Sequence, residues 1–174
     1  MSATLHERCR RIKLILSDVD GVLSDGGVTY DANGVESKRF HIRDGLGIKL
    51  WQKCGLQFGI VSARQSACTT TRAKELKIHL LRQSSLAKQP AVDELQREAG
   101  VTAEETAFIG DDLVDTAVMK RVGLGIAVAD AVLEARSAAA YVTQARGGHG
   151  AVREAIELIL KAQGRWEEVL QSFA

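Results

Sequence analysis

The chain has 174 residues, with 23 Lys and Arg against 22 Asp and Glu and a formal net charge of +1. Its 45% hydrophobic and 26% charged residues are typical of a globular domain, which at this length folds without disulfides or a structural metal. The near-neutral charge argues against nucleic-acid binding, and no apolar run is long enough to cross a membrane. We therefore expect a globular protein with neither nucleic-acid nor membrane partners.

The first residues and the cysteines indicate the compartment. Residues 1–11 are polar and mixed in charge, without the apolar core of a signal peptide. Cys9, Cys54 and Cys68 are odd in number and form no CxxC pair. We expect reduced thiols in a cytoplasmic protein.

Short apolar runs alternate with helical patterns along most of the chain. The first strand is predicted at 12–16, and a β-hairpin follows within 26–41 around the turn Asn33-Gly34. Further strands are predicted at 58–61, 78–81, 106–109, 125–128 and 141–143, and helices at 43–54, 65–76, 87–99, 113–122, 132–140 and 151–163. This alternation predicts an α/β fold, a doubly wound parallel sheet with a protruding hairpin. We expect one domain over 1–174, with a helical tail at 164–174.

Aspartates gather where predicted strands end, which is where ligands bind in such sheets. Asp18 and Asp20 follow the first strand, while Asp111, Asp112 and Asp115 follow the strand at 106–109. A single aspartate there would be explained as a helix cap, but two clusters at one sheet edge favour a shared ligand. Carboxylates brought together repel unless a cation compensates, and an oxygen-only ligand set favours Mg²⁺. One aspartate could then attack a phosphate, and a second could serve as general acid and base.

Several segments in order resemble the haloacid dehalogenase superfamily of phosphatases. They are DVDGVLSDG at 18–26, Ser62 after FGIV, and GDDLVD at 110–115. The hairpin segment and the later VGLGIAVADA and GGHGAVRE resemble its capless subgroup more closely. That subgroup contains 3-deoxy-D-manno-octulosonate 8-phosphate phosphatase and nonulosonate 9-phosphate phosphatases. The resemblance covers about residues 12–164 and implies a Mg²⁺-dependent, cytoplasmic hydrolase of a phosphorylated sugar acid, acting in lipopolysaccharide biosynthesis.

The resemblance also implies catalytic roles. Asp18 would be the nucleophile that carries the phosphoryl group. Asp20 would protonate the departing sugar oxygen and then deprotonate the attacking water. Ser62 would donate a hydrogen bond to a phosphoryl oxygen, and Lys88 would neutralise the charge of the transition state.

The implied binding roles involve the same edge of the sheet. Mg²⁺ would be held by Asp18, the backbone carbonyl of Asp20, and Asp111. Asp112 and Asp115 would lie behind them, with Asp115 orienting the lysine or a metal-bound water. Ser62 and Lys88 would also bind substrate, and Arg64 would face the sugar-acid carboxylate; an arginine there favours the eight-carbon acid. An exposed helix-start arginine is the alternative for Arg64.

Two motifs depart from the family pattern. The second motif commonly reads Thr-Gly-Arg, whereas this chain has Ser62-Ala63-Arg64. The third often reads Gln-Gly, two or three residues, then Lys, whereas this chain has RQSSLAK at 82–88, without the glycine. Lys88 is the best candidate because it opens a helix after a strand end; Lys74 and Lys77 precede that strand. A solvated surface lysine is the alternative for Lys88.

The hairpin is too short to be a cap domain. In capless relatives, hairpins associate in homotetramers so that neighbours cover each site, and Val28, Tyr30 and Val35 are apolar enough for such contacts. A hairpin folded on its own domain is the alternative. The tail after Gly164 has an amphipathic stripe that could reach a neighbouring site or dock on its own domain.

Two other functions fit parts of the pattern. A phospho-acceptor receiver module is also doubly wound and acidic, but its acceptor Asp follows the third strand, where this chain has none. A degenerate member would bind sugar phosphates without turnover, and the altered third motif keeps this reading open. A nonulosonate 9-phosphate phosphatase is the alternative within the enzyme class.

Overall fold

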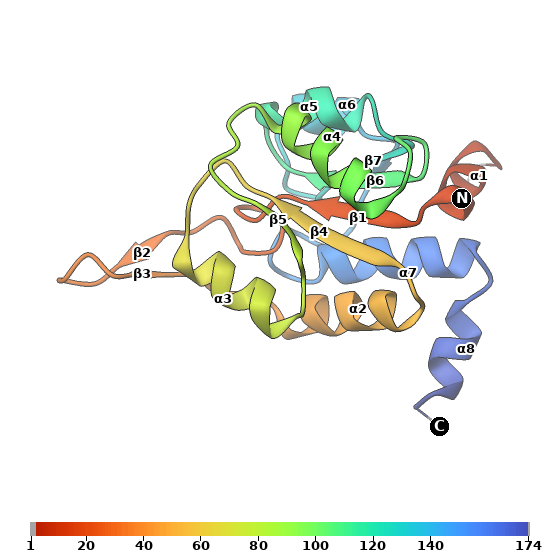
Figure 1. Ribbon diagram of the computed structural model, residues 1–174, viewed down its shortest axis with the longest axis horizontal. Helices are drawn as coiled ribbons and strands as arrows, with labels where there is room; N and C mark the ends of the chain where they lie inside the picture. The colour runs from red at the N-terminus through yellow and green to blue at the C-terminus, as the bar shows by residue number, and fades with distance from the viewer. Residues whose placement is uncertain (1–2, 174) are drawn as a thin grey trace.

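The computed structural model describes residues 3–173, and its centre is a six-stranded parallel sheet (Figure 1). The strand order is β5-β4-β1-β6-β7-β8. The strands are β1 (Leu14–Ser17), β4 (Gln57–Val61), β5 (Leu80–Arg82), β6 (Thr106–Gly110), β7 (Leu124–Ala127) and β8 (Tyr141–Val142). The central strands β1, β6 and β7 are buried throughout, as expected for near-continuous apolar runs in a sheet covered on both faces. The predicted α/β fold is confirmed.

Helices cover both faces of the sheet. One layer contains α2 (Ile42–Lys53) and α7 (Ala151–Ala162), with α1 (Ala3–Arg11) packed on α7. The other contains α4 (Lys88–Ala99), α5 (Leu113–Met119) and α6 (Leu133–Ala138), seen at the top of Figure 1. The shorter α3 (Ala67–Glu75) lies near the base of the hairpin. Helix α1 was not predicted, because within residues 4–11 of this polar segment only Leu5 and Cys9 pack toward the core.

The hairpin projects away from the body of the molecule (Figure 1). It pairs β2 (Thr29–Tyr30) with β3 (Glu36–Ser37) in antiparallel register. At its tip the Asp31 carboxylate accepts hydrogen bonds from the backbone N–H groups of Asn33 and Val35, each at 2.8 Å. Gly34 adopts a φ of +76°, which glycine tolerates best. The Asn33-Gly34 turn therefore closes the hairpin as predicted.

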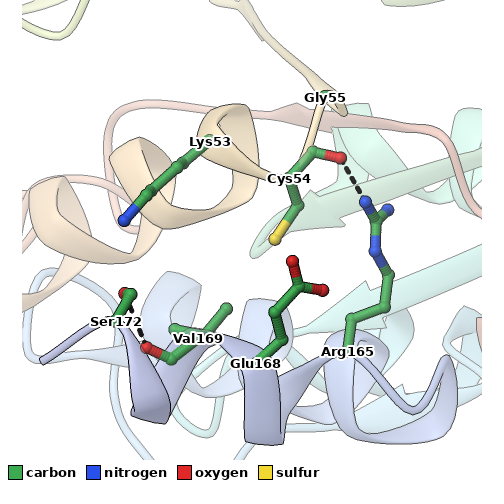
Figure 2. Close-up of a pocket in the computed structure, with 7 residues that line it drawn as sticks. All are labelled: Lys53, Cys54, Gly55, Arg165, Glu168, Val169 and Ser172. Carbon is green, nitrogen blue, oxygen red and sulfur yellow. Dashed lines mark hydrogen bonds between the residues drawn. The ribbon is translucent and has the colours of Figure 1, made fainter. Parts of the chain in front are cut away.

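The C-terminal tail packs on its own chain. Helix α8 (Trp166–Gln171) buries Trp166 and Val169, and the Arg153 guanidinium lies 5.2 Å from the Trp166 ring centre. A cavity of about 320 Å³ lies between α8 and the end of α2. Figure 2 shows the residues that line it, with Arg165 donating a hydrogen bond to the carbonyl oxygen of Cys54. Of the two alternatives for the tail, the structure favours docking on its own domain.

None of the helices within residues 3–173 is long and apolar enough to span a membrane. In the same part of the chain, all three cysteines are free thiols.

Candidate active site

The strand register brings the predicted site residues to one edge of the sheet. Ser17 at the end of β1 lies opposite Ile60 of β4 on one side and Ile109 of β6 on the other. Asp18, the loop after Val61 and the loop after Gly110 therefore leave the sheet together. The two aspartate clusters meet because their strands are neighbours.

Lys88 bridges the two clusters from the first turn of α4. Its ammonium lies 2.9 Å from Oδ2 of Asp18 and 2.6 Å from Oδ1 of Asp115, and its side chain has no exposed surface. Burial disfavours its charged form, but the carboxylates of Asp18 and Asp115 outweigh this and raise the pKa of Lys88. The alternative of a solvated surface lysine is wrong.

Asp115 is fully buried and fully hydrogen-bonded. Besides accepting from Lys88, it accepts from the backbone N–H groups of Asp111 at 2.9 Å and Asp112 at 3.2 Å. Asp112 caps α5, with its carboxylate accepting from the N–H of Leu113 at 2.7 Å. Asp115 thus orients Lys88 and fixes the loop that carries Asp111, whereas exposed Asp112 acts locally as a helix cap.

Asp111 carries an unused buried acceptor. Its Oδ1 has no hydrogen-bond partner within residues 3–173, although the atom is inaccessible to solvent. Burial, followed by the negative charges of Asp18 and Asp115, raises the pKa of Asp111 to about 8. Burial likewise raises the pKa of Asp18 to about 6, although Lys88 opposes the shift. A carboxylate held this way is stabilised by a cation or a proton.

A divalent cation fits this cluster. Oxygen atoms of Asp18, Asp111 and Asp115 lie within 4.8 Å of one another. When all three carboxylates are ionised, they exceed the single ammonium of Lys88 by two negative charges. A hard oxygen-only set suits Mg²⁺. Since Asp115 already uses both oxygens, Asp18 and Asp111 are the carboxylates available to bind it.

The glycine at position 21 allows a close approach in the same loop. A Cβ atom there would lie 2.1 Å from Oδ2 of Asp111, and Gly21 has a φ of +87°. Any side chain would therefore displace the Asp111 carboxylate.

The loops after β4 and β5 supply the other predicted polar groups. Ser62 is buried, and its hydroxyl accepts from the N–H of Arg64 at 3.2 Å. In the third-motif segment, Ser84 adopts a φ of +59°. Ser84 comes directly after Gln83 and so stands at the position where the family pattern Gln-Gly has its glycine. The loop therefore keeps the left-handed backbone that glycine favours, although the residue there is serine. This explains how Lys88 reaches the site despite the altered motif.

The carboxylate of Asp20 contacts residues outside the acidic cluster of Asp18, Asp111 and Asp115. Its Oδ1 accepts a hydrogen bond from the ammonium of Lys38, and its Oδ2 lies 3.8 Å from Nε of Arg64. Arg64 in turn donates to Glu36 Oε1 at 3.0 Å and to the Tyr30 hydroxyl at 3.1 Å. The structure thus brings Asp20 and Arg64 together, but around hairpin residues.

The sequence reasoning missed Glu36 and Lys38. A signal was available: Tyr30 and Glu36 are cross-strand partners in the hairpin, and Lys38 follows Glu36 by two residues. Period-two spacing puts such side chains on one face. In the structure this face of the hairpin contacts Asp20 and Arg64, whereas the sequence analysis expected the hairpin to make apolar contacts with other copies of the chain.

The glycine-rich segment 147–150 packs on the loop after β1. A Cβ on Gly147 would lie 1.6 Å from the carbonyl oxygen of Gly21, and one on Gly148 would lie 2.3 Å from the nitrogen of Asp25. Buried Asp44 of α2 holds the segment, because its carboxylate accepts from the N–H groups of Gly150 at 3.2 Å and Arg153 at 2.8 Å. The segment therefore packs closely against the loop after β1, which carries Asp18 and Asp20.

Comparisons with known proteins agree with this geometry. Residues 65–156 match a model described as haloacid dehalogenase-like hydrolase. The chain is 44% identical over 161 residues to the 3-deoxy-D-manno-octulosonate 8-phosphate phosphatase of Haemophilus influenzae, covering 92% of this chain and 89% of that protein. It is 40% identical over 168 residues to the phosphatase of the same name from Escherichia coli K12, covering 97% of this chain and 89% of that protein.

A solved structure is also similar over its whole length. It is the 3-deoxy-D-manno-octulosonate 8-phosphate phosphatase of Moraxella catarrhalis in complex with a magnesium ion, a phosphate ion and KDO. The TM-score is 0.97 at 37% identity, and the match covers 100% of both chains.

Proposed function

The chain belongs to the haloacid dehalogenase-like hydrolases, and from that premise we propose that it hydrolyses 3-deoxy-D-manno-octulosonate 8-phosphate in a Mg²⁺-dependent reaction. The observation that carries the proposal is the buried cluster of Asp18, Asp111 and Asp115 around Lys88. Relatives that act on this substrate are similar over nearly the entire chain.

The first chemical step uses Asp18. Its carboxylate attacks phosphorus, the ester P–O bond breaks, and the phosphoryl group is carried as an aspartyl-phosphate. Above its pKa of about 6 the carboxylate is ionised and can act as the nucleophile. Lys88, fixed by Asp115, neutralises charge that develops on the phosphoryl oxygens, and Ser62 offers them a hydroxyl hydrogen bond.

Asp20 moves the protons. In its protonated form it gives its proton to the departing sugar oxygen, so the free sugar acid leaves as an alcohol and Asp20 becomes a carboxylate. It then takes a proton from the water that attacks the aspartyl-phosphate, which releases phosphate and restores Asp18. The Asp20 side chain is 21% exposed, so solvent has access to it.

The metal would be held by the carboxylates of Asp18 and Asp111 and by the backbone carbonyl of Asp20. The orphaned Oδ1 of Asp111 and the excess negative charge of the cluster support this assignment. When bound, Mg²⁺ supplies Lewis-acid polarisation of the phosphoryl group and offsets the repulsion between carboxylates.

Arg64 is the residue we assign to the carboxylate of the sugar acid. Its side chain is 46% exposed at the rim of the site, and its planar fork can bind a carboxylate with two hydrogen bonds. The product would enter lipopolysaccharide biosynthesis.

We further propose a cytoplasmic homotetramer in which neighbours cover each site. The hairpin exposes apolar surface at Tyr30, 58% accessible, and Val35, 62% accessible. Such surface on a projecting element supports association between copies. Sedimentation of the purified chain tests this, and a monomer would contradict it.

Phosphate release by the purified protein tests the function. The substrates are the octulosonate 8-phosphate, a nonulosonate 9-phosphate and neutral sugar phosphates, each with Mg²⁺ and with a chelator. We expect turnover that is fastest on the eight-carbon acid, that chelation abolishes, and that Asp18→Asn removes. Phosphoryl labelling without turnover would favour a receiver module, and no reaction with any phosphate would favour a degenerate binding protein.

A further inference from the structure

A second ionic cluster joins the hairpin to the catalytic loop. Lys38 pairs with Asp20 and lies 3.9 Å from Oε1 of Glu36, while Arg64 pairs with Glu36 at 3.0 Å. Ser66 donates a further hydrogen bond to Glu36 Oε2. Two carboxylates meet two cations here, so this cluster is neutral without a metal, unlike the acidic cluster around Asp111.

Lys38 is the member of this cluster that is fixed in place. Its side chain has no exposed surface, whereas that of Arg64 is 46% exposed. Its ammonium bonds directly to Asp20, whereas Nε of Arg64 is 3.8 Å from the same carboxylate, beyond hydrogen-bond distance. Arg64, at the exposed rim, would exchange its hydrogen bonds to Glu36 and Tyr30 for bonds to a substrate, whereas Lys38 is enclosed and bonded to Asp20.

Glu36 adds a second negative charge near the ammonium of Lys38 and helps to fix its position. The hydrogen bond from Ser66, assisted by the charges of Lys38 and Arg64, lowers the pKa of Glu36 and keeps it ionised. Cys68 of α3 also donates to the backbone carbonyl of Glu36 at 3.3 Å. The base of the hairpin is thus anchored to the loop after β4.

We propose that Lys38 is a positioning residue for Asp20. Its buried ammonium holds the Asp20 carboxylate apart from the carboxylates of Asp18 and Asp111, in the orientation from which Asp20 exchanges protons with the leaving oxygen and with water. Without Lys38, Asp20 would sample other rotamers and lose that alignment. The inference rests on the proposed function, in which Asp20 is the general acid and base.

The test uses the dependence of rate on the leaving group. A sugar alkoxide is strongly basic and needs a proton as it departs, whereas p-nitrophenolate leaves without one. The parameter kcat/KM reports the steps up to departure of the leaving group, so it excludes the later hydrolysis of the aspartyl-phosphate, which both substrates share.

We expect Lys38→Met to lower kcat/KM about 100-fold on the sugar-acid phosphate and by less than about 5-fold on p-nitrophenyl phosphate. Asp20→Asn should give the same contrast, and Lys38→Arg should restore part of the loss. Arg39→Met is the matched control, because its side chain is 75% exposed and pairs with Asp25 instead. It should leave both rates unchanged.

Equal losses on both substrates would show a merely structural role and overturn the inference, as would wild-type rates in Lys38→Met. If Lys38→Met does not fold, Lys38→Gln, which keeps a donor but no charge, is measured by the same criterion. A wild-type chain without turnover on either substrate would instead refute the proposed function itself.

Discussion

Replacing Lys88 with methionine tests the electrostatic balance of the acidic cluster. Methionine preserves most of the apolar stem and removes only the charge, so no large cavity forms. The ammonium it removes is fully buried between Asp18 at 2.9 Å and Asp115 at 2.6 Å. The variant therefore leaves three carboxylates with no cation among them.

The magnitude follows from burial. Removing one partner of a buried ion pair costs about 3–5 kcal/mol, and for a chain of this size each kcal/mol lowers Tm by about 2–4 °C. We expect Tm of the metal-free variant to fall by about 6–20 °C, with Mg²⁺ recovering part of the loss because it compensates the buried carboxylates that have lost their cation. Loss of charge stabilisation in the transition state should lower kcat by about 100- to 1,000-fold.

The assay combines thermal unfolding, with and without Mg²⁺, and phosphate release. Lys74→Met is the matched control, because Lys74 lies exposed on α3 and has no ion pair within residues 3–173. It should change neither Tm nor kcat. The role assigned to the Lys88 ion pairs would be refuted if Lys88→Met kept kcat within twofold of the wild-type value and Tm within about 2 °C of it.

Three further predictions concern the loops and the metal. Ser84→Gly should raise the free energy of unfolding by up to about 1 kcal/mol, because it relieves the strain of a left-handed φ of +59°. Ser85→Gly should lower it, because Ser85 has no positive φ, and the opposite order of the two variants in denaturant unfolding would contradict this. Mg²⁺ should raise Tm more at pH 8 than at pH 6. The pKa values of Asp18, about 6, and Asp111, about 8, are raised by folding, so the metal-free protein loses stability as pH rises through them, and fewer protons then compete with the metal for the carboxylates. A Mg²⁺-induced Tm shift that does not depend on pH would refute this prediction. Asp44→Ala should cost about 2–3 kcal/mol by leaving two backbone N–H groups at the start of α7 unpaired, measured by chemical unfolding against the exposed control Asp93→Ala, and equal midpoints for the two variants would contradict it.

Local sequence patterns predicted which helices and strands exist better than they predicted the residues at which these begin and end. Helix α7, with apolar residues at helical spacing, lies within one residue of its predicted range, and Gly100 ends α4 in the left-handed conformation expected of a C-terminal glycine. Strand β5 begins two residues later than expected, at Leu80, because only Leu80–Arg82 pair with β4, while Ile78 and His79 lie in the connection between the turn after α3 and the strand. Strand ends depend on the neighbouring strand, which a local pattern does not contain.

The site was predictable as a set of strand ends but not as a set of contacts. Asp18, Lys88 and Asp111 were expected at one edge and lie there. Lys38 and Glu36 were not predicted as site residues. Their period-two spacing indicates a shared face, but the direction of that face is set by contacts with Asp20, Arg64 and Ser66, which come from other segments.

The sequence by itself determined the alternating strands and helices, and with them the edge of the sheet where the aspartates would meet. Apolar periodicity fixes which face of each element is buried, and connection rules then fix the parallel sheet. Only the tertiary structure decided which charges pair there: Lys88 with Asp18 and Asp115, and Lys38 with Asp20. Those partners come from segments far apart in the chain, and their pairing depends on distance and burial, which exist only once the sheet has assembled.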